Sequence, residues 1–342
     1  MSLINLLKKR NRKLLFTTPS HSQKFFIFNK FRQFYKYDIS ETDVYDPQTA
    51  LIKAQKRASK IYGTNYTYFL TNGSSSGIIA SVLACANKGD KILIWKNAHP
   101  CHYNAVKLAN CEPVFYDVPI SKEWGVPIQT TPEALKDLKG IKAVIITSPT
   151  YEGYASDIET LKKICNENGA YLIVDEAHGA LYPFSKRLPQ SAVNIADFTV
   201  QSLHKTAGGL NPTALLHSNC DIDPFNALSM INTTSPSYPL LASIEANINY
   251  LNSSKGKRKL ETLIDSIIEL RNSCKNIEFG GDDVTKILIK KSDLTGFELS
   301  QNLYDNFNIE DEKTNNISTM LLCGIGTSKS KLLKLEQSLK KL

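Results

Sequence analysis

A strand-like segment in the middle of the chain ends in residues capable of acid and base chemistry. The apolar run 170–173 leads into Val-Asp-Glu-Ala-His-Gly-Ala at 174–180, and open α/β sheets carry their chemistry at such strand ends. DEAH also occurs in nucleotide hydrolases, which need G-x-x-x-x-G-K-[ST] to bind phosphates. That motif is absent, because lysine follows glycine only at Gly256-Lys257, and Arg258 comes next. The segment therefore indicates a chemistry other than nucleotide hydrolysis.

A lysine follows another predicted strand. Lys205 lies in Gln-Ser-Leu-His-Lys-Thr-Ala-Gly-Gly at 201–209. A lysine amine whose pKa is lowered by burial or by a neighbouring cation can form a Schiff base. The alternative is a surface lysine in a loop, which the adjacent serine, histidine and paired glycines disfavour.

Two further segments at strand ends could bind a flat, phosphorylated cofactor. In Thr-Asn-Gly-Ser-Ser-Ser-Gly at 71–77, the three hydroxyls of Ser74, Ser75 and Ser76 lead into a helix whose first N–H groups can bind phosphate. Alone this is weak evidence, since serine is an ordinary N-cap. His99, in Asn-Ala-His-Pro-Cys-His at 97–102, can lay its ring against a cofactor. On its own segment, a buried structural histidine is the favoured alternative.

Together these groups match the requirements of pyridoxal 5′-phosphate (PLP). Asp175 can hold a proton on a pyridine nitrogen, His178 can reach the ring hydroxyl, and Lys205 can bind the aldehyde. The cluster at 99–102 also carries metal-capable side chains, but no second ligand pair at a familiar spacing accompanies it. We therefore predict a PLP site and no metal site.

Strand-like runs rich in Val, Ile and aromatic residues alternate with segments of helical periodicity. This alternation predicts a mostly parallel sheet covered by helices. Strands are expected at 66–71, 91–95, 113–116, 142–147, 171–174, 198–201 and 214–217, and helices at 47–62, 75–86 and 156–168. A small α+β domain follows, with a long helix to about 274, strands at 284–289 and 318–323, and helices at 296–306 and from 329. The expected boundaries are 1–34 for an N-terminal arm, 35–254 for the large PLP-binding domain and 255–342 for the small domain.

Composition narrows the function classes. The 342 residues are 42% hydrophobic and carry a formal charge of +8, enough for a large core. The basic excess is dispersed, apart from the runs 8–13 and 340–341, so nucleic-acid binding is not expected. Seven scattered cysteines without a C-x-x-C pair indicate reduced thiols. With no apolar run of about 20 residues and no secretory leader, we expect a cytoplasmic protein that does not bind membranes.

The order of these motifs resembles the fold-type-I ornithine/lysine/arginine decarboxylases from about Leu15 to the end. The motifs shared are TPSH at 18–21, the segment 38–55, FLTNGSSSG at 69–77, N-x-H at 97–99, SPTYEG at 148–153, VDEAHGA, QSLHKT and TTSPSY at 233–238. The resemblance implies an α/β large domain of PLP fold type I (aspartate-aminotransferase-like) and a small C-terminal α+β domain. It also implies roles for the site residues: Lys205 as the Schiff-base lysine, Asp175 as the pyridinium partner, His99 as the stacking residue, Ser74, Ser75, Ser76 and Ser202 at the phosphate, and His178 and His204 beside the ring and lysine.

The chain departs from that family in places. TPGHK is usual where this chain has TPSHS at 18–22, the acidic linker before Pro47 is shorter, and short-form members continue past the small domain, whereas this chain stops at Leu342. These departures affect the expected substrate more than the cofactor site.

By resemblance, the expected activity is PLP-dependent decarboxylation of an amino acid, and the expected substrate is a basic one: lysine, arginine or ornithine. A basic side chain needs a carboxylate partner, for which the candidates are Glu41, Asp43, Asp46 and Glu152. The resemblance also implies a homodimer or larger assembly with shared active sites, where Thr234 approaches the partner's phosphate. Two alternatives stay open: another PLP reaction, such as transamination, aldol cleavage or carbon–sulfur lysis, and a non-catalytic relative.

Overall fold

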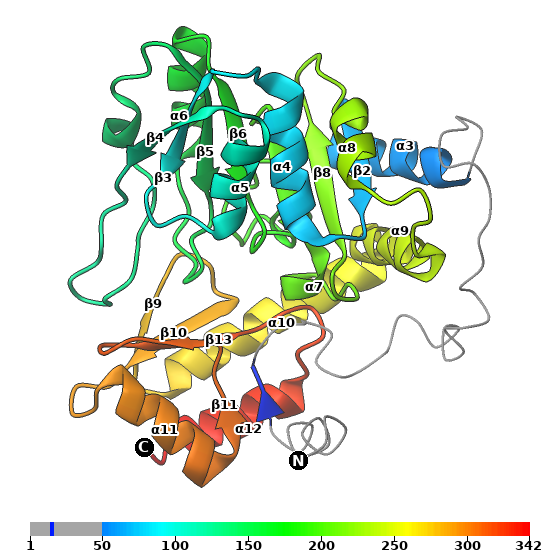
Figure 1. Ribbon diagram of the computed structural model, residues 1–342. Coiled ribbons are helices and arrows are strands. Elements are labelled where there is room, and N and C mark those ends of the chain that lie inside the picture. Colours follow the sequence, from blue (N-terminus) through cyan, green and yellow to red (C-terminus); the bar gives the residue numbers. More distant parts are fainter. Residues whose placement is uncertain (1–13, 17–49) are drawn as a thin grey trace, which may run out of the picture.

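The computed structural model describes residues 14–16 and 50–342, and a seven-stranded sheet is the centre of its larger part (Figure 1). Its strands are β2 (Tyr66–Leu70), β3 (Lys91–Trp95), β4 (Glu112–Tyr116), β5 (Ile141–Thr147), β6 (Tyr171–Asp175), β7 (Phe198–Ser202) and β8 (Ala214–Ser218). They lie in the order β2-β8-β7-β6-β5-β3-β4. β8 is antiparallel to both neighbours, and the other pairs are parallel. The expected mostly parallel sheet is confirmed.

Helices cover both faces of this sheet because its central strands are apolar on both sides. One face carries α4 (Gly73–Cys85), α5 (Pro100–Leu108) and α8 (Phe225–Ile231). The other carries α6 (Ile158–Glu167), with α3 (Ala50–Tyr62) and α9 (Tyr238–Asn252) next to β2 and β8. α4 packs very close to the sheet at Gly77, where an added Cβ would lie 2.7 Å from Cγ1 of Val200.

A second, antiparallel sheet follows in the chain. Its strands, in spatial order, are β12 (Lys313–Thr314), β13 (Thr319–Leu322), β10 (Lys286–Lys290) and β9 (Glu278–Gly280). Three helices accompany it: α10 (Ser254–Ser273), α11 (Gly296–Phe307) and α12 (Lys329–Leu339). A short parallel pair joins β1 (Leu14–Leu15) to β11 (Ile309–Glu310). In Figure 1 this part lies below the large sheet, with α10 running diagonally from beside α9 into it.

Local signals account for several helix ends. Asp157 caps α6 by accepting from the N–H of Thr160, and Thr295 forms a capping box with Glu298 at the start of α11. α5 and α8 were not predicted from periodicity.

None of the described helices has the length and apolar character that crossing a membrane requires.

Candidate active site

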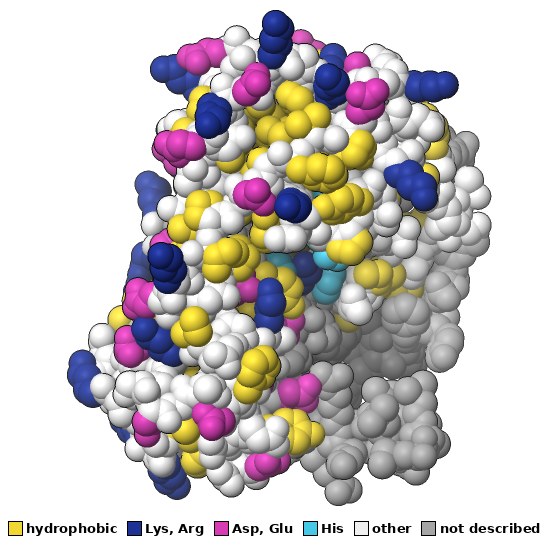
Figure 2. Space-filling view, turned by 60° about the vertical axis from the view of Figure 1, so that its left-hand side comes forward, with side chains coloured by type: hydrophobic (Ala, Val, Ile, Leu, Met, Phe, Trp, Pro, Cys, Tyr) yellow, Lys and Arg dark blue, Asp and Glu magenta, His cyan; other side chains and the backbone are white. Residues whose placement is uncertain are grey.

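A cavity of about 490 Å³ lies at the carboxyl ends of the parallel strands, facing the second sheet. Figure 2 shows histidine side chains in a hollow on this face of the molecule. Seven of the residues predicted for the cofactor site line the cavity: Ser74, Ser75, His99, Asp175, His178, His204 and Lys205. The fold thus brings together side chains that lie more than 130 positions apart in the chain, as expected where parallel strands end at one edge.

Asp175, the last residue of β6, is held as a buried carboxylate. Its Oδ2 accepts from Nε2 of His102 at 3.0 Å, and its Oδ1 accepts from the N–H of Ala177 at 3.1 Å. Burial raises the pKa of Asp175, but the hydrogen bond and charge of His102 and the charge of Lys205 outweigh it, so the pKa lies below its usual value. A stable negative charge therefore faces the cavity.

Lys205 lies on the single turn α7 (Leu203–Thr206), directly after β7. Burial lowers the pKa of its amine, although the charge of Asp175 opposes this effect. The Nζ atom of Lys205 lies 3.1 Å from Nε2 of His178, and Nδ1 of the same ring lies 3.2 Å from Nζ of Lys286. Two lysines thus contact opposite nitrogens of one imidazole.

The other two predicted histidines are fixed by backbone hydrogen bonds. His99 is the N-cap of α5, where its Nδ1 accepts from the N–H of Cys101 at 3.2 Å. His204 donates from Nδ1 to the carbonyl of Thr213 at 3.1 Å. Burial is the largest cause that lowers the pKa of both rings. Each neutral ring therefore has a defined orientation at the cavity wall.

The start of α4 supplies N–H groups without a side-chain cap, since Asn72 makes no capping hydrogen bond. Ser74 and Ser75 line the cavity there. Ser76 is not among the residues that line it; its side chain is buried, and its hydroxyl donates to the carbonyl of Gly73 at 2.7 Å. Ser202 is fully buried, and its Oγ has no hydrogen-bond partner.

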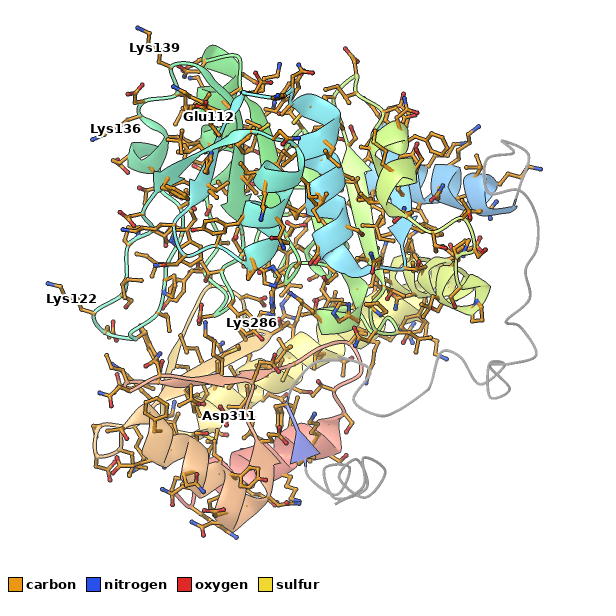
Figure 3. All side chains as sticks on the ribbon, in the orientation of Figure 1. Glu112, Lys122, Lys136, Lys139, Lys286 and Asp311 are labelled. Carbon is orange, nitrogen blue, oxygen red and sulfur yellow. The ribbon has the colours of Figure 1, made fainter. Side chains whose placement is uncertain are left out.

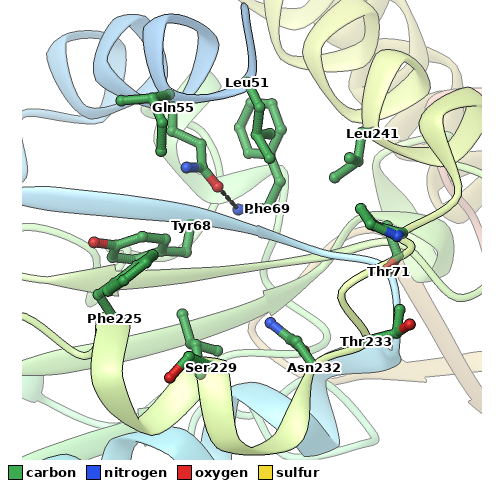
Figure 4. Close-up of a pocket in the computed structure, with 13 residues that line it drawn as sticks. Leu51, Gln55, Tyr68, Phe69, Thr71, Phe225, Ser229, Asn232, Thr233 and Leu241 are labelled. Carbon is green, nitrogen blue, oxygen red and sulfur yellow. Dashed lines mark hydrogen bonds between the residues drawn. The ribbon is translucent and has the colours of Figure 1, made fainter. Parts of the chain in front are cut away.

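Thr234 lies on the surface of the described chain, away from the cavity. Its neighbour Thr233 lines a second cavity of about 90 Å³, between α3, β2 and α8 (Figure 4). The motif at 18–21 and the candidates Glu41, Asp43 and Asp46 lie outside the described residues.

Glu152 is the candidate carboxylate that lies within the described chain. Its side chain is 3% exposed and lines the cavity, with Oε1 accepting from Nζ of Lys313 at 2.6 Å and Oε2 unpartnered. Tyr151 packs its ring 4.4 Å from that of His178 and donates to Glu312 at 2.5 Å.

Sequence reasoning missed Lys286, His102, Tyr151 and Lys313. The sequence did contain a signal for Lys286. It is the first residue of the apolar strand Lys-Ile-Leu-Ile-Lys, and lysine is rarely buried unless it has a partner. His102 lies with Cys101 and Asp175 in a cluster whose ligand-capable atoms are within 4.8 Å of one another. Within this cluster, His102 donates a hydrogen bond to Asp175 and so fixes the orientation of its carboxylate.

Comparison with known proteins gives concordant matches. The family model described as Orn/Lys/Arg decarboxylase, major domain, matches residues 5–312. The arginine decarboxylase of Bacillus anthracis is 30% identical over 313 residues, which cover 84% of this chain and 63% of that protein. This chain therefore spans less than two thirds of that relative's length.

Solved structures share the fold. The Francisella novicida lysine decarboxylase LdcF superposes with a TM-score of 0.81 at 19% identity, covering 98% of this chain and 59% of that one. A structure of SPT with PLP gives a TM-score of 0.73 at 14% identity, covering 96% and 87%. The large domain therefore has PLP fold type I, as expected.

Proposed function

Because the chain belongs to the ornithine/lysine/arginine decarboxylase family, we propose that it is a PLP-dependent enzyme that releases CO2 from a basic amino acid. One observation carries the proposal: a half-buried lysine of lowered pKa and a buried carboxylate of lowered pKa line one cavity of about 490 Å³. Such perturbed groups in a concave site are typical of catalysis.

The residues present fit PLP. The uncapped start of α4 and the unpartnered hydroxyl of Ser202 would hold its phosphate. Asp175 would pair with its ring nitrogen, His99 would cover its ring, and Lys205 would bind it covalently. We propose these roles for the residues identified from the sequence, with His178 and His204 beside the ring and the lysine. Ser76 would contribute its backbone N–H rather than its hydroxyl, which is already engaged.

When bound, PLP supplies an electron-poor ring that stabilises the negative charge left on Cα after CO2 departs. The chain supplies the fixed groups around it. Asp175 keeps a full negative charge in a buried site, because His102 and the N–H of Ala177 both donate to it. Lys205 and the neighbouring His178 are placed to return a proton to Cα.

Glu152 is the carboxylate that we propose for the substrate's basic side chain. Its Oε1 already accepts from Nζ of Lys313, but its buried Oε2 has no hydrogen-bond partner. A cationic group that reached Oε2 would satisfy an acceptor whose isolation is otherwise unfavourable. An amino acid whose side chain carries no donor would leave this oxygen unpaired, and a charged donor would give the stronger hydrogen bond to a carboxylate, so the site favours a basic substrate.

The test is a screen of lysine, arginine, ornithine and neutral amino acids with PLP added, in which released CO2 and the amine product are measured. Release of CO2 with equal amine from one basic amino acid is the expected result. Formation of a keto acid would instead indicate transamination. No turnover of any amino acid by a PLP-loaded chain would favour a non-catalytic relative.

We also propose a homodimer with shared sites, in which the exposed Thr234 of one subunit reaches the phosphate held by the other. Light scattering should then give about twice the chain mass of 38.2 kDa. Mixing inactive Lys205→Ala and Thr234→Ala chains should restore activity, because one site in each hybrid is intact. An active monomer would refute the dimer, and a dimer without restoration would refute the shared site.

We further propose that the protein acts in the cytoplasm, since its seven cysteines are all free thiols. The boundaries 1–34, 35–254 and 255–342 remain our proposal for its domains.

A further inference from the structure

Three histidines line the cavity, and the hydrogen-bond partners of two of them decide which ring nitrogen carries the hydrogen. The three are His99, His178 and His204. A neutral imidazole has one N–H and one lone pair, so the partner of one nitrogen determines what the other nitrogen offers. A backbone N–H can only donate and a backbone carbonyl can only accept. His99 contacts the first kind of group and His204 the second.

The hydrogen of His99 is on Nε2. This residue is the N-cap of α5, and its Nδ1 accepts from the N–H of Cys101 at 3.2 Å. The sulfur of Cys101 lies 3.0 Å from the same nitrogen. Burial raises the pKa of this thiol to about 12, so the thiol keeps its hydrogen and can donate to Nδ1 as well. A hydrogen on Nδ1 would point at these donors and remove the cap.

The position of His99 also opposes protonation of its ring. The imidazole lies at the N-terminal end of α5, where the helix dipole makes a further positive charge unfavourable. Burial lowers the pKa of His99, as do the charges of Lys205 and His102, and the charge of Asp175 opposes them. Nδ1 is the ring nitrogen that has hydrogen-bond partners within residues 14–16 and 50–342. Nε2–H is therefore available to a ligand in the cavity.

The other two histidines differ from His99 in this respect. Nδ1 of His204 lies 3.1 Å from the carbonyl of Thr213 and must donate to it, so the neutral ring presents a lone pair at Nε2. Both nitrogens of His178 are engaged, because Nζ of Lys205 lies 3.1 Å from Nε2 and Nζ of Lys286 lies 3.2 Å from Nδ1. Figure 3 shows Lys286 where the second sheet meets the large part of the molecule. Among these three rings, His99 is thus the one with an N–H to offer.

We propose that Nε2–H of His99 binds the α-carboxylate of the substrate. The inference rests on the proposed function, in which His99 covers one face of the cofactor and the substrate's amine takes the place of Lys205. The charge of Lys205 acts on His99, so the two side chains are near each other. A donor on one face of the cofactor holds a carboxylate out of the plane of the ring. The bond to CO2 must point in that direction if its electrons are to enter the ring.

A neutral donor suits this task better than a cation would. The carboxylate loses its charge as CO2 leaves, so any group that stabilises the carboxylate more than the transition state slows the reaction. An imidazolium would stabilise the carboxylate by its full charge. The uncharged N–H of His99 gives a weaker interaction that still orients the carboxylate.

The first test compares stable conjugates that carry or lack the α-carboxylate. Phosphopyridoxyl-lysine is compared with phosphopyridoxyl-cadaverine, and a second pair is made from arginine and agmatine. None of them can release CO2, and their binding to the full chain without cofactor is measured by calorimetry. We expect the carboxylate to improve binding about 10- to 100-fold, the range for one hydrogen bond to a charged group. Equal affinities within each pair would overturn the inference alone, and failure of all four to bind would refute the proposed cofactor site and the inference with it.

Two substitutions separate donation by His99 from covering of the cofactor ring. His99→Phe keeps a flat ring without an N–H, so the preference for the carboxylate should fall about tenfold or more while the amine conjugates bind almost as before. His99→Gln is the matched control, since it restores a side-chain N–H without the ring. It should keep the preference but bind all conjugates more weakly. A folded His99→Phe chain that keeps the full preference would overturn the inference.

Nitrogen-15 NMR of the histidine-labelled wild-type chain without cofactor tests the tautomer directly. The signals of His99 and His204 are assigned by their loss in His99→Gln and His204→Gln. We expect the hydrogen on Nε2 of His99 and on Nδ1 of His204. A hydrogen on Nδ1 of His99, or an imidazolium there at neutral pH, would overturn the inference whatever the conjugates do.

Discussion

Asp175→Asn separates the charge of this residue from its place in the fold. In the wild-type chain both oxygens accept hydrogen bonds, one from Nε2 of His102 and one from the N–H of Ala177. The amide oxygen of asparagine can still accept from Ala177, which turns its NH2 group toward His102. Nδ1 of His102 has no partner, so the ring can move its hydrogen there and accept through Nε2. The fold should therefore survive, with a loss of about 1 kcal/mol in unfolding free energy.

Turnover should fall far more than stability. Removing one preorganised electrostatic group from a buried site lowers kcat by about 10²–10³-fold, or roughly 3–4 kcal/mol. Cofactor binding should persist, because the phosphate contacts proposed at α4 do not involve Asp175. The assays are CO2 release, PLP titration and urea unfolding of the same preparation.

The matched control is Asp197→Asn, since Asp197 is also a buried carboxylate, which accepts from Lys162 at 2.6 Å and from the N–H of Leu172 at 2.7 Å, outside the cavity. It should lose stability but keep its turnover. Near wild-type turnover in Asp175→Asn would show that the charge is not required.

Three further substitutions test other parts of the structure. Lys205→Ala should abolish the visible absorption band that PLP gives with the wild-type chain, whereas Lys290→Ala should keep it; a band in both would exclude Lys205 as the binding amine. Gly77→Ala should lower the unfolding free energy by about 1–3 kcal/mol, because its Cβ would lie 2.7 Å from Val200; an unchanged urea midpoint would refute this tight contact. Burial lowers the pKa of His217 to about 3, so stability is lost as pH falls below about 6.5, by about 2 kcal/mol from pH 7 to 5. His217→Asn should remove that part of the slope, and an equal slope in both chains would contradict the assignment.

The sequence predicted the strands of the large sheet because their apolar runs are local signals. β5, for example, reads Ile-Lys-Ala-Val-Ile-Ile-Thr and is almost wholly buried. The position of Asp175 at a strand end and of Lys205 just past the next strand followed from the same patterns. The pairing of β2 with β8 did not, since it joins segments about 150 residues apart and depends on the packing of the whole domain.

The interactions that tune the site were also beyond the sequence. The His102–Asp175 and Lys286–His178 contacts span 73 and 108 residues, so no local spacing encodes them. Ser76 shows a different difficulty. A serine in the first turn of a helix can bind a ligand or bond back to the chain, and the sequence alone does not distinguish these states, whereas the structure has the hydroxyl bonded to Gly73.

The placement of charge around the cavity connects the proposals. Lys205, Lys286 and Lys313 bring positive charge to His178, two of them from the second sheet. The negative charges at the cavity differ in their hydrogen bonding. Both oxygens of Asp175 accept hydrogen bonds, from His102 and Ala177, whereas one oxygen of Glu152 has no partner. Positive charge that is partly removed from water is stabilised by anionic partners, and the phosphate of PLP and the carboxylate of an amino acid would supply them. The unpartnered oxygen of Glu152 then remains to accept a hydrogen bond from the positively charged side chain that distinguishes basic amino acids from the others.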